Sequence, residues 1–135
     1  MIINGEKQFK SDGILTFEKL INWGYDVFST RMSLSFASIT SIPDGVFEKF
    51  PRLEYLSING NDISRINSNM FKGLSKLKNL VLEFNSIKSI ENDSFVDLVN
   101  LELLSLNNNE LNEMVEFFMF DNYFFSFLNS YTCIL

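Results

Sequence analysis

Residues 53–76 read LEYLSINGNDISRINSNMFKGLSK, and residues 77–100 read LKNLVLEFNSIKSIENDSFVDLVN. A shift of 24 residues superimposes eight positions of these segments, seven of them apolar and one asparagine. The superimposed pairs are Leu53/Leu77, Leu56/Leu80, Ile58/Leu82, Asn61/Asn85, Ile63/Ile87, Ile66/Ile90, Phe71/Phe95 and Leu74/Leu98. A fixed period of this length predicts a repeat architecture, in which each unit buries its apolar edge against its neighbours.

The same spacing continues on both sides of these two repeats. Six further matching positions follow them, namely Leu101, Leu104, Leu106, Asn109, Leu111 and Met114. A weaker repeat precedes them, because Ser29 replaces the first leucine and Ala37 replaces the asparagine. Its retained apolar positions are Met32, Leu34, Ile39, Ile42, Phe47 and Phe50. The pattern therefore predicts about four repeats over residues 29–114.

Each repeat is expected to form one coil of a solenoid. The alternation within L-x-x-L-x-L predicts a short strand, and the asparagine that follows ends the strand in a tight bend. The F-x-x-L spacing places two apolar side chains on one side of a short helical or 3₁₀ turn. Stacked coils then give an α/β solenoid with parallel strands on its concave face and loops or short helical turns on its convex face.

The repeated asparagine has a specific structural role in this interpretation. Asn61, Asn85 and Asn109 come where the chain bends after each strand, and an asparagine amide both donates and accepts hydrogen bonds. Backbone groups left unpaired by a buried bend would cost about 1–3 kcal/mol each. We therefore predict a ladder of inward-facing asparagines, with three surface turn residues as the alternative.

The pattern L-x-x-L-x-L-x-x-N-x-I-x-x-I-x-x-x-x-F-x-x-L resembles the typical 24-residue class of leucine-rich repeat. The link Ile42-Pro43-Asp44-Gly45-Val46-Phe47 is also similar to one that recurs in that family. The resemblance covers residues 29–114 and implies an arc whose strand-lined concave face binds proteins. It also implies an extracellular or cell-surface setting, because repeats of this class are found mostly there, including in receptors of animals such as insects.

Residues 1–28 show no repeat. Short alternating stretches at residues 14–17 and 23–28 predict one or two strands that cap the first repeat. Trp23 and Tyr25 would then bury its exposed end. A partly ordered tail is the alternative interpretation of this segment.

The repeat register fails in residues 115–135, which read VEFFMFDNYFFSFLNSYTCIL. Three interpretations of this phenylalanine-rich segment remain open: an apolar cap on the last repeat, a membrane helix, and the end of a truncated or wrongly spliced gene. A membrane helix needs about 20 mainly apolar residues, and four polar residues interrupt the segment: Glu116, Asp121, Asn122 and Asn129. Membrane association of this chain is therefore not expected.

Charge and residue content exclude several classes of function. The formal net charge is −6 and no cluster of lysine and arginine occurs, so we expect no nucleic acid partner. The chain has no histidine and one cysteine, Cys133, which rules out a histidine-based triad, an intramolecular disulfide and a cysteine zinc site. Because nucleotide-binding, hydrolase and metalloprotease motifs are also absent from the sequence, we expect no enzyme, no cofactor, no metal and no small-molecule substrate.

The polar residues around Asn92 carry no site in this interpretation. Glu91, Asp93 and Asp97 fall on the predicted convex side, where solvated carboxylates are ordinary. The triplet Asn92-Asp93-Ser94 lacks the spacing of a calcium-binding EF-hand loop. We also expect no Asn-x-Ser/Thr glycosylation acceptor in the chain.

The candidate binding residues lie between the inward leucines of each predicted strand. They are Arg31, Ser33, Ser35, Tyr55, Ser57, Asn59, Asn79, Val81, Glu83, Leu103, Ser105 and Asn107. Tyr55, Val81 and Leu103 would place apolar groups among polar ones, which is typical of a protein-binding patch. Packing across neighbouring strands is the alternative for Val81 and Leu103. The residues expected at the rim are Phe36, Gly60, Phe84 and Asn108, of which Phe84 is expected to help to fill the core.

The sequence therefore predicts a non-catalytic protein–protein interaction module whose partner is another protein. The alternative is a fragment or structural section of a larger receptor-type leucine-rich repeat protein, without binding activity of its own. The first residues lack the apolar run of a secretory signal peptide, and one cysteine cannot form the cysteine-rich caps that exported repeats usually carry. The chain is then either intracellular, or the mature part or a fragment of an exported protein.

Overall fold

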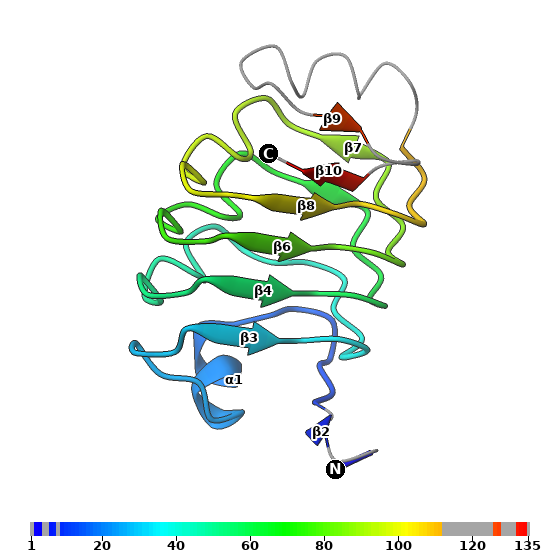
Figure 1. Ribbon diagram of the computed structural model, residues 1–135. Coiled ribbons are helices and arrows are strands. Elements are labelled where there is room, and N and C mark those ends of the chain that lie inside the picture. The colour runs from blue at the N-terminus through cyan, green and yellow to red at the C-terminus, as the bar shows by residue number, and fades with distance from the viewer. Residues whose placement is uncertain (1, 4–5, 8, 112–125, 128–131, 135) are drawn as a thin grey trace.

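The computed structural model describes residues 2–3, 6–7, 9–111, 126–127 and 132–134. Successive coils of the chain each contribute one short strand to the same side of the molecule (Figure 1). These strands are β3 (Arg31–Ser33), β4 (Tyr55–Ser57), β6 (Asn79–Val81) and β8 (Leu103–Ser105). They are parallel, and their register advances by 24 residues from strand to strand. The predicted solenoid is confirmed.

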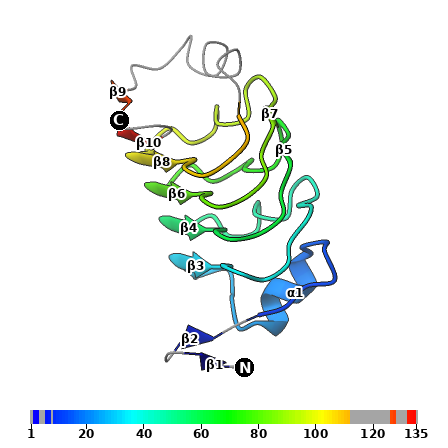
Figure 2. The ribbon, with the colours of Figure 1, turned by 90° about the vertical axis from the view of Figure 1, so that its right-hand side faces the viewer.

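The opposite side of the coils carries a smaller sheet and a series of turns. Strands β5 (Arg65–Ile66) and β7 (Ser89–Ile90) are parallel and lie across the coils from the main sheet (Figure 2). The F-x-x-L segments close into single turns, as where the Leu98 amide donates to the Phe95 carbonyl at 3.0 Å. Main-chain groups on this side therefore pair within a turn or, through β5 and β7, with the neighbouring coil. The main sheet is the larger of the two regular surfaces.

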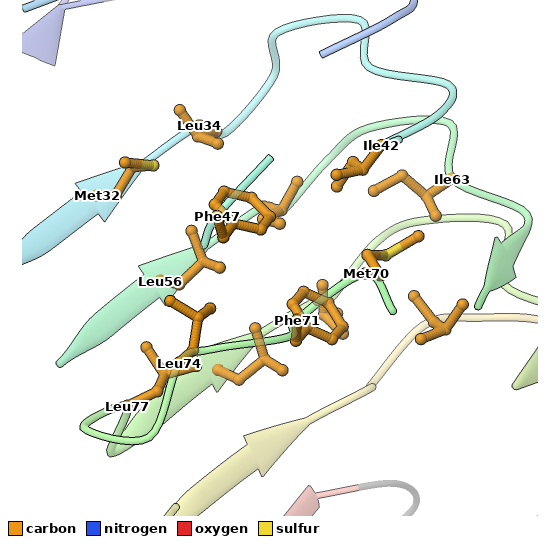
Figure 3. Packing of buried hydrophobic residues seen from close by; sticks show 14 of the residues in the cluster. Met32, Leu34, Ile42, Phe47, Leu56, Ile63, Met70, Phe71, Leu74 and Leu77 are labelled. Carbon is orange, nitrogen blue, oxygen red and sulfur yellow. The ribbon is translucent and has the colours of Figure 1, made fainter. Parts of the chain in front are cut away.

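The core fills the space between these two sides (Figure 3). The inward leucines and isoleucines of the repeats are buried, except Ile90, which is half-buried, and three phenylalanines stack along the solenoid axis. The ring centroids of Phe47 and Phe71 are 6.2 Å apart, and those of Phe71 and Phe95 are 6.0 Å apart. Burying one such large apolar side chain contributes roughly 1.5–3 kcal/mol. The period of the sequence thus becomes a continuous core rather than a set of separate clusters.

The amino-terminal segment differs from the strands expected at residues 14–17 and 23–28. Strands β1 (Ile2–Ile3) and β2 (Glu6–Lys7) form an antiparallel pair, and residues 17–22 form helix α1 (Phe17–Asn22). The Thr16 hydroxyl caps the helix by accepting from the Lys19 amide at 3.3 Å. Phe17 and Leu20 are three residues apart, so they share the side of the helix that packs on the core.

Aromatic side chains cover the first coil beside this helix. Phe9 stacks on Trp23 with ring centroids 4.8 Å apart and meets the edge of Tyr25 at 6.0 Å. The Tyr25 hydroxyl donates to the Ser33 carbonyl at 2.9 Å and accepts from the Ser33 amide at 3.0 Å. Burial raises the pKa of Tyr25. The phenol thus pairs both main-chain groups of Ser33 in the terminal strand β3, where an unpaired edge would invite association.

Two strands from the carboxy-terminal segment extend the main sheet. Strand β10 (Thr132–Ile134) pairs antiparallel with β8, and β9 (Ser126–Phe127) pairs antiparallel with β10. The sheet order is β3-β4-β6-β8-β10-β9. A further repeat would have added a parallel strand, so the change of direction coincides with the loss of the period. Met114 lies outside the described residues, as does the segment 115–135 apart from β9 and β10.

Candidate functional site: the strand face and its rim

Three asparagine amides tie each bend to the neighbouring coil and so fix the backbone beneath the candidate site. Asn61 Nδ2 donates to the Leu34 carbonyl at 2.9 Å, and Asn61 Oδ1 accepts from the Ile39 amide at 2.9 Å. Asn85 and Asn109 make the corresponding contacts one and two coils further along. Asn61 and Asn85 are buried, so their amides pair main-chain groups inside the bends.

The outward side of β3, β4, β6 and β8, which we call the strand face, carries the predicted binding residues. Arg31 and Ser33 are exposed; Ser35, Tyr55, Asn59, Asn79, Val81, Glu83, Leu103 and Asn107 are half-buried; Ser57 and Ser105 are buried. Ser57 and Ser105 are each only 2% exposed, and their hydroxyls form hydrogen bonds with Ser35 and Glu83. They therefore offer a partner almost no surface.

Contacts between neighbouring strands hold the polar side chains of the strand face in place. The Arg31 guanidinium lies 4.1 Å from the centroid of the Tyr55 ring, a cation–π contact. Asn59 Oδ1 accepts from the Glu83 amide at 3.0 Å, and Ser105 Oγ donates to the Glu83 carboxylate. Side chains that are already ordered lose less conformational entropy when a partner binds. The polar side chains of the strand face are therefore held in a defined arrangement by their neighbours.

The rim, which consists of Phe36, Gly60, Phe84 and Asn108, has an unusual backbone. All four residues are left-handed, with φ angles of 56°, 63°, 53° and 57° along the chain. Glycine and asparagine adopt this conformation readily, whereas a bulky phenylalanine rarely does. The amides of Phe36, Gly60 and Phe84 each donate to the next coil, at 2.9, 3.0 and 3.1 Å. The repeat thus imposes one conformation on the rim, whatever residue stands there.

The rim phenylalanines point into solvent. Phe36 is 63% exposed and Phe84 is 56% exposed, so the expectation that Phe84 fills the core is wrong. In the left-handed bend the inward direction belongs to the next residue, Asn85, which leaves the phenylalanine outside. A Cβ on Gly60 would come within 2.3 Å of the Phe36 ring, so that ring lies directly over the glycine. The glycine and asparagine at equivalent positions were the sequence signal for this outward direction.

Charged side chains on the flanks of the coils pair between neighbouring coils. The hydrogen bond to Glu54 at 3.0 Å, together with the charge of that carboxylate, raises the pKa of Lys78. A hydrogen bond from the Ser68 amide and an ion pair with Arg65 lower the pKa of Glu91. These ion pairs join neighbouring coils at their flanks.

Metal and membrane features are absent from the described ranges, which run from residue 2 to residue 134 with gaps. No group of three or more histidine, cysteine, aspartate or glutamate side chains in these ranges could hold a metal ion. In the same ranges no helix combines the length and the apolar character needed to cross a bilayer.

Comparisons with known proteins match this geometry. A family model described as leucine rich repeat matches residues 30–87 and 75–118. Human Toll-like receptor 3 is 47% identical over 51 residues, which are 38% of this chain and 6% of the receptor. A crystal structure of a TLR13–ssRNA13 complex has a TM-score of 0.62 and 35% identity, covering 66% of this chain and 13% of that chain. The Toll–Spatzle complex of Drosophila has a TM-score of 0.64 and 25% identity, covering 73% and 13%.

One of these neighbours corrects an expectation drawn from charge. The TLR13 structure is a complex with single-stranded RNA, so the expectation that nucleic acid is excluded as a partner is wrong. The net charge of −6 is a sum over the whole chain, whereas binding depends on the local arrangement of charges and aromatic groups. The chain spans 13% or less of the length of each of these proteins.

Proposed function

Because this chain belongs to the leucine-rich repeat family, we propose that it is a non-catalytic module that binds another protein through the strand face and its rim. The observation that carries this proposal is the exposure of Phe36 and Phe84 beside an ordered polar surface. Exposed aromatic groups ringed by polar ones are typical of the centre of a protein interface. Phenylalanine is unfavourable in the left-handed backbone that the repeat imposes on the rim, so its presence at two of the four rim positions supports a role other than packing.

The size of the surface limits the contact that four coils can make. A standard protein interface buries roughly 800 Å² on each partner, and few side chains carry most of its binding energy. The two rim phenylalanines and the half-buried Tyr55 are the aromatic anchors available here. A small interface with two or three anchors therefore agrees with the geometry better than a broad one.

Site-specific photo-cross-linking tests this proposal even though the identity of the partner is unknown. A photoreactive phenylalanine analogue at position 84 is expected to trap a protein in cells that produce the chain. The control places the same analogue at position 99, because Val99 is 69% exposed and lies outside the strand face and rim. Trapping of RNA instead of protein at position 84, or equal trapping from position 99, would contradict the proposal.

Two substitutions separate binding from folding, because the rim itself provides their precedents. Phe84→Gly and Phe36→Gly both copy Gly60, so both variants suit the left-handed backbone. Each is expected to weaken binding of the trapped protein about tenfold or more, as loss of an aromatic anchor does, while stability is kept or increased. Val99→Gly is the matched control, with unchanged affinity. Unchanged affinity in both rim variants would remove the rim from the site.

The second candidate is a section of a larger receptor-type protein. It is favoured by coverage, since the chain corresponds to 6% of Toll-like receptor 3 and 13% of each solved neighbour. Sequencing the transcript beyond residue 114 tests it. An additional in-frame 24-residue repeat there would support this candidate, whereas a transcript that encodes residues 1–135 alone would argue against it.

A further inference from the structure

The triplet Asn92-Asp93-Ser94 has the form Asn-x-Ser with a residue other than proline in the middle, which is the acceptor pattern for N-linked glycosylation. It is the only triplet of this form among the 135 residues. The expectation that the chain holds no acceptor is therefore wrong. We propose that Asn92 is an N-glycosylation site, which receives an oligosaccharide when the chain enters the secretory pathway.

The position of the triplet suits a bulky polar modification. Asn92 is exposed in the turn that follows β7, on the side of the coils opposite the main sheet (Figure 2). Just before it, Glu91 is held to the preceding coil by the Ser68 amide and by Arg65. The base of the turn is thus fixed while the Asn92 side chain faces solvent, so a glycan there would displace no packed group.

The triplet also departs from the repeat at its third residue. The residues one and two coils earlier are Met70 and Val46, and both are buried and apolar. Ser94 occupies the same buried position with a 5% exposed side chain, and its hydroxyl donates to the Glu91 carbonyl at 2.6 Å. A serine in a buried apolar position gives up apolar burial, and the acceptor pattern requires a hydroxyl there.

The middle residue, Asp93, is left-handed with a φ of 62°, and Gly45 in the first repeat has a φ of 76°. Aspartate is among the residues other than glycine that adopt this conformation most readily. The acceptor pattern accepts any residue except proline at this place, so the buried Ser94 is the residue of the triplet that departs from the packing of the repeat.

Transfer of the oligosaccharide to Asn92 needs one co-reactant, a lipid-pyrophosphate-linked oligosaccharide supplied by the secretory pathway. Asn92 Nδ2 forms a bond to the anomeric carbon of the first sugar. The bond from that carbon to the pyrophosphate oxygen breaks, the lipid pyrophosphate leaves with the electron pair, and Nδ2 gives up one proton. Because the Ser94 hydroxyl is buried in the folded domain, the transfer precedes the folding of this turn.

A glycan at Asn92 would leave the strand face free. Strands β3, β4, β6 and β8 lie across the coils from the turn that carries Asn92 (Figure 2). The modification would shield the coil of residues 77–100 on its outer side and keep other macromolecules from that side. Partners would then be directed to the sheet side of the solenoid.

Production of the full 135-residue chain behind a cleavable secretion signal in eukaryotic cells tests the proposal. Intact mass and gel mobility are measured in the secreted and cell-retained fractions, before and after treatment with peptide-N-glycosidase. We expect the mass of one oligosaccharide, removed by the enzyme with conversion of Asn92 to aspartate. Asn92→Gln and Ser94→Ala should each abolish it, while Ser94→Thr should keep it.

The matched control is Asn69→Gln, because Asn69 is also exposed and lies one coil earlier but is followed by Met70 and Phe71. This variant should carry the glycan like the unaltered chain. An unaltered chain without added mass in both fractions would overturn the proposal, as would a glycan that persists in Asn92→Gln. Since the cell-retained fraction is measured too, a variant that fails to fold still gives a decisive result.

Discussion

The ladder asparagines combine two properties that a bend in a solenoid requires. The side chain is short enough to stay inside the bend, and its amide both donates and accepts hydrogen bonds. Asn85 shows the result, since its Nδ2 donates to the Ile58 and Leu82 carbonyls while its Oδ1 accepts from the Ile63 amide. Two of these contacts reach the preceding coil, so one side chain satisfies backbone groups of two repeats.

Asn85→Ala should leave these backbone groups unpaired within a buried bend. We expect the free energy of unfolding to fall by about 1–3 kcal/mol, as for other buried groups that lose their partner. Urea denaturation of bacterially produced protein measures this change. Asn69→Ala is the control at an exposed position, where a change within about 0.5 kcal/mol is expected. An unchanged midpoint for Asn85→Ala would contradict the ladder.

The direction of each side chain could be predicted from the sequence only where the alternation of the strand applies. Leu56 and Leu80 are buried as expected, and Tyr55 and Val81 on the other side are half-buried. Alternation ends with the strand, so it could not place Phe84, whose direction follows from a left-handed backbone. It also could not predict the burial of Ser57, because depth within a surface depends on the sizes of neighbouring side chains.

Helix α1 shows how local signals compete within one element. Alternation in residues 14–17 suggested a strand, yet Thr16 is an N-cap residue and Phe17 and Leu20 have helical spacing. Six residues form a marginal helix in isolation, so its packing against the first coil decides the outcome. That packing involves distant residues, such as Phe50, whose ring centroid lies 5.6 Å from that of Phe17, and it was therefore not readable from the local sequence.

Thr16→Ala should remove the cap and loosen the helix. We expect a loss of about 1 kcal/mol in the free energy of unfolding, the usual effect of removing an N-cap hydroxyl. Amide hydrogen exchange should quicken in residues 19–22 before it changes in the strands. Thr16→Ser keeps an accepting hydroxyl and serves as the control. Equal exchange rates in the alanine variant and the unaltered chain would show that the hydroxyl does not stabilise the helix.

The link between the β5 and β7 coils should depend on pH through Glu91. The hydrogen bond from the Ser68 amide and the charge of Arg65 lower the pKa of Glu91 in the folded state. A lowered folded pKa means that the carboxylate contributes stability above its ordinary pKa and loses this contribution as the pH falls through the folded value. Glu91→Gln should therefore destabilise the chain at neutral pH and have a diminishing effect as the solution is acidified.

Urea midpoints of both proteins at several pH values between neutral and strongly acidic measure this difference. Glu102→Gln is the control, because Glu102 is exposed and lies outside this link. A difference between the Glu91 variant and the unaltered chain that stays constant across the pH range would assign its effect to packing and not to charge.

In the molecule as a whole, each coil is stabilised by its neighbours. The main sheet, the asparagine ladder and the phenylalanine stack all join adjacent coils, and each repeats with the 24-residue period. An architecture of this kind gains its stability from the interfaces between units more than from the units themselves. The 24-residue period could therefore predict the whole solenoid, while the two ends, where the period fails, could not be predicted in the same way.

Phe71→Ala should act on the entire array, because Phe71 stacks between Phe47 and Phe95 and is 1% exposed. We expect a loss of about 3–5 kcal/mol, the usual effect of truncating a buried phenylalanine, against a total stability of about 5–15 kcal/mol for a domain. Circular dichroism during urea denaturation measures it. Phe28→Ala, at a position that is 64% exposed, should change stability far less. Similar losses in both variants would argue against a continuous core.

The asparagine ladder also determines how the molecule would respond to force. Each rung joins a coil only to the coil before it, through contacts such as that between Asn85 and the Ile58 carbonyl. The strands are stacked along the solenoid axis, so tension between the two ends loads their hydrogen bonds one row at a time. The protein would lengthen in steps, because each rung would open at a similar force and release one 24-residue coil.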